Sequence, residues 1–179
     1  NATAVVVGAG MIGLCVIQAL RWAGATRIIA VDLADNRLAL ARELGATDTL
    51  RSDCCDVPAA VAQLTGGLGA DVALEVVGIS ATLSLALASV RRGGSVVLVG
   101  NLAAKTDFPL QSVVTRELTL HGTCASAGEY PLCLDLIARG VIRVEPLISA
   151  LAPLADGAAW FKKLSAPGGA QTMKVILTP

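Results

Sequence analysis

A glycine-rich turn between two apolar runs constrains the fold of this chain more than any other feature. The motif G-x-G-x-x-G occupies residues 8–13 and follows the apolar run 3–7. An amphipathic run then leads to a second apolar run, 27–31, which ends at Asp32. This order predicts strand, turn, helix and strand, the arrangement that binds a dinucleotide.

Each glycine of the turn has its own expected role. Gly8 permits the tight turn, Gly10 lets a diphosphate approach the backbone, and Gly13 lets the helix pack closely on the sheet. The open amides at the start of the helix predicted over 11–23 would hold the diphosphate. Asp32 would accept hydrogen bonds from both hydroxyls of the adenosine ribose. The alternative interpretation is a turn needed only for helix packing, with Asp32 as a surface acid.

Strand and helix patterns alternate along the rest of the chain. We expect strands near 3–7, 27–31, 47–50, 71–76, 95–99, 118–122 and 173–177, and helices near 11–23, 35–44, 57–65, 79–90, 128–139 and 153–164. Such alternation favours a parallel sheet with right-handed crossovers. We therefore predict an α/β, doubly wound parallel sheet, the Rossmann fold, with strand order 3-2-1-4-5-6 by analogy with dinucleotide-binding domains. The dinucleotide-binding domain would span 1–124 and a C-terminal segment 125–179.

The composition fits a compact domain and excludes several partners. The 179 residues are 54% hydrophobic and 16% charged, with a formal net charge of +0. A sheet covered on both faces needs a high apolar fraction. The neutral charge gives no footprint for nucleic acid, and no apolar run reaches the roughly eighteen residues of a membrane span. We expect neither nucleic acid nor membrane as a partner.

The five cysteines are scattered, and only one histidine, His121, is present. An odd number of scattered thiols favours a reducing cytoplasm without disulfides. Cys15 and Cys133 lie in apolar helical runs and are predicted to be core residues. His121, in an apolar strand, is also expected to pack in the core. A zinc site needs about four nitrogen or sulfur ligands, so we predict no metal site in this chain.

Ordered blocks of sequence carry a resemblance to a known family. They are V-x-G-A-G-x-I-G-L at 6–14, L-T-G-G-L-G-A-D-V-A-L-E-V-V-G at 64–78, R-R-G-G-S-V-V-L-V-G at 91–100 and K-V-I-L-T-P at 174–179. Over nearly its whole length the chain resembles the medium-chain, zinc-dependent alcohol and polyol dehydrogenases. The segment 122–131 is more similar to the sorbitol-like polyol branch than to the ethanol branch.

The resemblance implies a dehydrogenase that oxidises a small alcohol or polyol by hydride transfer to NAD. In that family about half the length precedes the strand at residue 3, and this lobe carries the zinc that polarises the alcohol oxygen. We therefore expect zinc only in that lobe, no catalytic residue in this chain, and cofactor binding without turnover. The alternatives are the cofactor domain of a zinc-free quinone or enoyl reductase and a stand-alone nucleotide-binding module.

The resemblance also implies which residues hold the cofactor. Ile12 would pack under the nicotinamide ring, Arg37 would lie beside the adenosine ribose, and Lys174 would reach the diphosphate. The alternatives are a solvated helix charge for Arg37 and an exposed strand-end charge for Lys174. Glu75 is expected to be a structural anchor of the loop after its strand. The full expected set is Gly8, Gly10, Met11, Ile12, Gly13, Asp32, Arg37, Val77, Gly78, Val99, Gly100, Asn101, Thr123, Ala125 and Lys174.

Two surfaces are expected to associate. The helix predicted at 153–164 carries Leu154, Trp160, Phe161 and Leu164 at roughly helical spacing. The strand near 118–122 would present a free sheet edge, which members of the resembling family use to dimerise. We therefore expect a homodimer, formed through one or both of these surfaces.

Overall fold

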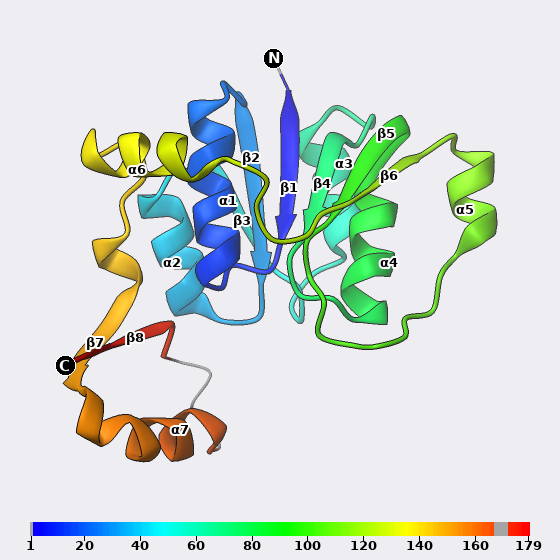
Figure 1. Cartoon of the computed structure of the whole chain (residues 1–179). Helices are drawn as coiled ribbons and strands as arrows, with labels where there is room; N and C mark the ends of the chain where they lie inside the picture. The colour runs from blue at the N-terminus through cyan, green and yellow to red at the C-terminus, as the bar shows by residue number, and fades with distance from the viewer. Residues whose placement is uncertain (1, 167–171) are drawn as a thin grey trace.

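A six-stranded parallel sheet forms the centre of the molecule, which is known from a computed structural model (Figure 1). The structure describes residues 2–166 and 172–179. The strand order is β3-β2-β1-β4-β5-β6, and every neighbouring pair is parallel. The predicted doubly wound sheet and its order are confirmed. The strands are β1 (Thr3–Val7), β2 (Arg27–Asp32), β3 (Asp48–Arg51), β4 (Ala70–Glu75), β5 (Val90–Leu98) and β6 (Thr119–Gly122).

Helices cover both faces of this sheet. Helices α1 (Met11–Trp22) and α2 (Asp35–Glu43) pack on one face, and α3 (Val57–Leu64) and α4 (Ser80–Ser89) pack on the other. Strand β1 shows why its sequence is continuously apolar. Val5 and Val7 enter the core under α3 and α4, whereas Val6 enters the core under α1. Successive side chains of a strand point to opposite faces, so a strand covered on both sides needs no polar residue.

The C-terminal part folds beside the main sheet. Helix α6 (Tyr130–Ala138) lies near α1, and a second sheet of two parallel strands, β7 (Ile148–Pro153) and β8 (Lys174–Thr178), lies apart from the first (Figure 1). Two short 3-10 turns, η1 (Glu145–Leu147) and η2 (Leu154–Asp156), flank β7, and α7 (Gly157–Ser165) follows them. The predicted helix at 153–164 therefore starts too early, because Pro153 still belongs to β7.

Four other sequence predictions need correction. The strand expected near 95–99 begins at Val90. The helix expected at 128–139 begins at Tyr130, because Gly128 has a φ of +109°, which no helix allows. The short helix α5 (Leu110–Thr115) was not predicted. His121 is not a core residue but is exposed. Its neighbours Leu118 and Leu120 pack against the core under α4, so His121 points to the opposite face of β6.

The cysteine prediction is also wrong in one position. Cys15 is half-buried in α1 and packs against the core, but Cys133 in α6 is exposed. Both thiols line one apolar groove of about 360 Å³ between these helices. Burial, with a smaller contribution from Cys133, raises the pKa of the Cys15 thiol above its ordinary value. None of the helices in the described ranges has the length and apolar character that a membrane span requires.

Candidate dinucleotide-binding site

The glycine turn between β1 and α1 has three positions with different steric requirements. Gly8 has a φ of +102°, which favours glycine, and its N–H donates to the Val31 carbonyl at 2.8 Å. A Cβ atom on Gly13 would lie 1.9 Å from the Gly8 carbonyl oxygen, so only glycine lets α1 start this close to β1. A Cβ atom on Gly10 would meet no atom within 4 Å. Gly10 therefore faces open space.

Helix α1 begins directly behind this open space. Gly10 is its N-cap and has no side chain that could accept from the first amides of the helix. Met11 and Ile12 form the first turn, and the Ile12 side chain is 47% exposed. The amides of a first helical turn carry a partial positive charge and have no partner within the helix. This end of α1 has the chemistry of an anion site.

The carboxylate of Asp32 is fixed at the end of β2, beside the glycine turn. Its Oδ2 accepts from the Ala9 N–H at 2.8 Å, and its Oδ1 accepts from the N–H groups of Leu33 and Ala34 at 2.8 and 3.0 Å. Arg37 Nη1 lies 3.7 Å from Asp32 Oδ2. The side chain of Asp32 is only 8% exposed, so its position is well determined.

Two hollows lie along the carboxyl ends of the strands. The first measures about 310 Å³, and the predicted residues that line it are Gly8, Asp32, Arg37 and Val77. The second measures about 590 Å³, and the predicted residues that line it are Ile12, Val77, Val99, Gly100, Asn101, Thr123 and Ala125. Val77 lines both, so the two hollows are neighbours. The structure thus brings most of the predicted residues to one edge of the sheet.

Sequence reasoning missed several residues of these hollows. Ser52 lines the first, and Val76, Leu102 and Cys124 line the second. All four follow the end of a strand closely, and that position is the signal that could have found them.

Predicted residue Gly78 has a packing role that the hollows alone do not reveal. A Cβ atom on Gly78 would lie 2.4 Å from the Asn101 amide nitrogen, and one on Gly100 would lie 2.2 Å from the Gly78 nitrogen. The loops after β4 and β5 therefore cross in direct backbone contact. The buried carboxylate of Glu75 accepts from the N–H groups of Val77 and Gly78 at 2.9 and 2.8 Å. Its expected role as a loop anchor is confirmed.

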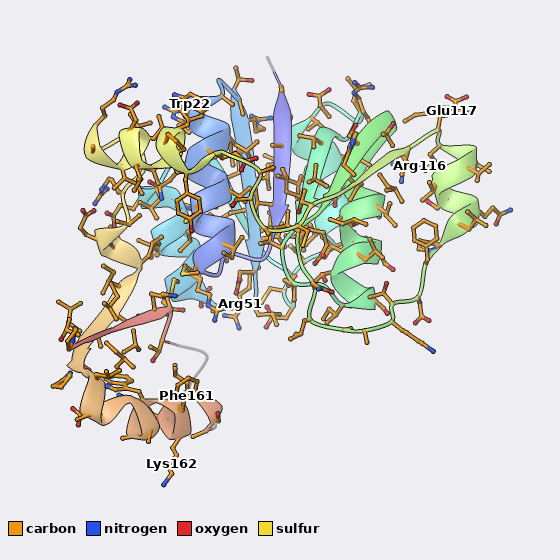
Figure 2. All side chains as sticks on the ribbon, in the orientation of Figure 1. Trp22, Arg51, Arg116, Glu117, Phe161 and Lys162 are labelled. Atoms are coloured by element: carbon orange, nitrogen blue, oxygen red, sulfur yellow. The ribbon has the colours of Figure 1, made fainter. Side chains whose placement is uncertain are left out.

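The charged side chains beside the first hollow largely form ion pairs with one another. Arg51, at the edge of the sheet where the strands end (Figure 2), donates to Asp35 and Asp53, each at 2.8 Å. The hydrogen bond with Asp53 is the main cause that raises the pKa of Arg51, and the same bond lowers the pKa of Asp53. This cluster braces the loop that carries Ser52.

Lys174 is the predicted residue that the structure does not bring to the others. It lies exposed on β8 and lines neither hollow. Within residues 2–166 and 172–179, no group of three or more His, Cys, Asp or Glu side chains is placed to hold a metal ion. The described residues therefore do not fit a zinc ion, and the open turn at Gly10, flanked by the two hollows, fits a dinucleotide.

Comparison with known proteins gives the family. The family described as "Zinc-binding dehydrogenase" matches residues 12–139. The chain is 38% identical to L-idonate 5-dehydrogenase of Vitis vinifera, over 80% of this chain and 40% of that protein. It is 35% identical to sorbitol dehydrogenase 1 of Saccharomyces cerevisiae, over 98% of this chain and 51% of that protein.

A solved structure shows the same architecture. A Sinorhizobium meliloti 1021 protein, described as a zinc-binding dehydrogenase and bound to NADP, matches with a TM-score of 0.90 and 30% identity. The match covers 100% of this chain and 53% of that one. The chain thus spans about half the length of the relatives it matches. With the family matched over most of the chain and the fold shared throughout, the chain belongs to the zinc-binding dehydrogenase family.

Proposed function

We propose that this chain binds NAD and forms the cofactor-binding part of an enzyme that oxidises an alcohol or polyol. One observation carries the proposal: two hollows meet at Val77, on either side of the open glycine turn. A dinucleotide has the matching shape, because two nucleosides flank one diphosphate. The carboxyl ends of parallel strands are where open α/β sheets bind such ligands.

Each part of the cofactor has a proposed partner. The diphosphate lies over Gly10 at the start of α1, where a Cβ atom would meet no other atom within 4 Å and no side chain caps the helix. Asp32 accepts hydrogen bonds from the adenosine ribose in the first hollow. The nicotinamide packs on Ile12 in the second hollow, and backbone groups of Val99 and Thr123 orient it. Bound NAD would supply the hydride acceptor that such an oxidation needs.

Asp32 also supports a preference for NAD over NADP. A 2′-phosphate would meet its carboxylate, and the repulsion between like charges disfavours binding. Arg37, which could otherwise attract a phosphate, lies 3.7 Å from Asp32. The solved relative from Sinorhizobium meliloti is bound to NADP, and the acid at position 32 is our reason for choosing NAD for this chain.

The substrate class rests on the relatives. Their names include L-idonate 5-dehydrogenase, sorbitol dehydrogenase and (R,R)-butanediol dehydrogenase, all of which imply substrates with several hydroxyl groups. We place the catalytic zinc and most of the substrate pocket in a part of the full-length enzyme outside this chain. The isolated chain then binds cofactor without turnover.

A calorimetric titration of the chain with NAD and, separately, NADP tests the proposal. We expect one saturable NAD site with a dissociation constant of about 1 mM, because one wall of the cleft is missing and less of the ligand is buried. NADP should bind at least about tenfold more weakly. Equal or tighter binding of NADP would refute the preference for NAD. A tightly bound zinc ion at one per chain, or steady NADH formation from polyols, would refute the proposal that zinc and turnover belong to a part of the enzyme outside this chain.

A further inference from the structure

We propose that Glu75 is a positioning residue for the nicotinamide half of the cofactor. The proposal rests on the NAD-binding function proposed above and goes beyond anchoring of a loop. Glu75 ends β4 and is 2% exposed. A buried carboxylate is costly unless its oxygens accept hydrogen bonds, so the bonds that it makes must be well formed.

The side chain of Glu75 holds the loop after β4. Its Oε1 accepts from the N–H groups of Val77 and Gly78, and its Oε2 lies 3.1 Å from the same Gly78 nitrogen. The carboxylate therefore fixes two successive amides of this loop.

The backbone of Glu75 holds the loop after β5. Its carbonyl accepts from the N–H groups of Val99 and Gly100, both at 2.9 Å. The Gly78 carbonyl in turn accepts from the Ala103 N–H at 2.9 Å. Because Gly78 and Gly100 are also in direct backbone contact, a shift of one loop must displace the other.

These two loops form most of the second hollow. Six of its ten lining residues belong to them: Val76, Val77, Val99, Gly100, Asn101 and Leu102. The charged groups of the first hollow come from other elements, namely Asp32 on β2 and Arg37 on α2, and its hydroxyl groups are those of Ser52 after β3 and Thr82 on α4. Weakening the hydrogen bonds of Glu75 should therefore disturb binding of the nicotinamide end of the cofactor more than binding of the adenosine end.

The variant Glu75→Gln isolates this role. Glutamine has the same shape, but one of its two terminal atoms is an NH₂ group that cannot accept a hydrogen bond. The amide oxygen can keep the bonds that Oε1 makes with Val77 and Gly78, while the NH₂ group takes the place of Oε2, 3.1 Å from the Gly78 nitrogen, and repels that N–H. The matched control is Glu117→Gln, which alters an exposed carboxylate that pairs with Arg92 at the opposite end of the sheet (Figure 2).

Two ligands distinguish the halves of the site. NADH contains the nicotinamide ring, and ADP-ribose lacks it. For Glu75→Gln we expect NADH affinity to fall about tenfold, the cost of one charged hydrogen bond, while ADP-ribose affinity stays within about twofold. At saturating NADH, the Glu75→Gln variant should also lack the change in nicotinamide fluorescence that the parent chain shows on binding. Glu117→Gln should match the parent chain in all three measurements.

The outcomes distinguish failure of the positioning role of Glu75 from failure of the NAD-binding function. An equal loss for both ligands, or no loss for either, would show that Glu75 serves only folding and would overturn the positioning role. If Glu75→Gln does not fold, hydrogen exchange in the parent chain decides: NADH, but not ADP-ribose, should slow exchange of the Gly78 and Gly100 amides. If the parent chain binds neither ligand, the NAD-binding function fails and this proposal with it.

Discussion

At the scale of single residues, neighbouring glycines have different roles. A Cβ atom on Gly13 would collide with the backbone of Gly8, in the turn after β1, whereas one on Gly10 would meet only open space. The first position is therefore constrained by folding, and we propose that the second is constrained by the ligand. The motif at 8–13 and the expected role of each glycine could be recognised from the sequence, and the structure adds the distances that distinguish the two positions.

The pair of variants Gly10→Ala and Gly13→Ala tests this division. Gly13→Ala should lower the free energy of unfolding by about 2–4 kcal/mol, because the backbone must move. Gly10→Ala should change it by less than about 1 kcal/mol, the cost of a poorer N-cap, yet weaken NAD binding. Urea denaturation and calorimetry measure the two effects. A Gly10→Ala chain that binds NAD as well as the parent would argue against a diphosphate at this turn.

Asp32 provides the second test at this scale. Asp32→Ala should lower NAD affinity by about tenfold and narrow or abolish the preference over NADP, because both the ribose acceptor and the repelling charge are lost. Asp135→Ala is the matched control, since Asp135 pairs with Arg139 on α6 and lines neither hollow. The ratio of NAD to NADP affinity is the measurement. An unchanged ratio in Asp32→Ala would contradict the assignment of the ribose to this acid.

Residue predictions failed where the sequence could not tell which face of an element is covered. His121 lies on the exposed face of β6, and Cys133 lies in the apolar groove between α6 and α1, where it remains exposed. Lys174 was assigned by resemblance, and its strand lies in the separate β7–β8 sheet. Glu75, in contrast, could be identified as an anchor, because its spacing to Gly78 is fixed within one loop.

At the scale of elements, the predicted and observed ranges agree best where the element is buried. Strands β1 and β2 and helix α1 match their predicted ranges within a residue, because continuous apolar runs and an amphipathic run mark them clearly. Helix α5 was missed because it has only six residues and, within it, none is buried. The start of α7 was misjudged because Pro153 ends β7 and a 3-10 turn intervenes.

Hydrogen bonds of a charged side chain join the starts of three strands and lead to a prediction at the scale of elements. Asp71 on β4 accepts from the Thr3 N–H of β1 and from Arg91 Nε of β5, each at 2.8 Å. Arg91 first, and Thr3 second, lower the pKa of Asp71 below its ordinary value of 3.8. Since the folded-state pKa is the lower one, this stabilisation is present above pH 3.8 and is lost as the pH falls through the folded-state pKa.

Asp71→Asn should therefore destabilise the chain at pH 7 by about 1 kcal/mol, a modest value because the side chain of Asp71 is 38% exposed. The difference from the parent chain should shrink as the pH falls below 3.8, where the unfolded chain is protonated first, and it should vanish below the folded-state pKa, where both states are protonated. Thermal denaturation of both chains across this range measures it. A difference that does not depend on pH would show that the charge of Asp71 contributes nothing.

At the scale of the whole molecule, apolar groups remain uncovered on α7 and its flanks. Phe161 is 71% exposed and Leu154 63%, while Lys163 lies over the Trp160 ring at 4.4 Å. Figure 2 shows Phe161 and Lys162 on α7, away from the main sheet. Within the described residues, β6 pairs with β5 alone and so forms an edge of the sheet. Exposed apolar groups and open edges both favour association.

We therefore expect the chain to form dimers as its concentration rises. Burial of apolar surface contributes about 25 cal/mol per Å², so even a modest contact between copies is favourable. Phe161→Ser should weaken the association, and Lys162→Ser, one residue away, should not. Light scattering over a wide concentration range measures both variants. A parent chain that stays strictly monomeric would contradict the expectation.

The central claim is that a nicotinamide dinucleotide lies along the strand ends, with its diphosphate at the start of α1. The most direct test is a titration of the isotopically labelled chain with NADH, followed through the backbone amide signals in NMR. The account predicts saturable shifts, half-complete at about 1 mM, in the amides of residues 8–14, 99–101 and 123–125. An absence of saturable shifts at several times that concentration, or saturable shifts confined to other residues, would contradict it.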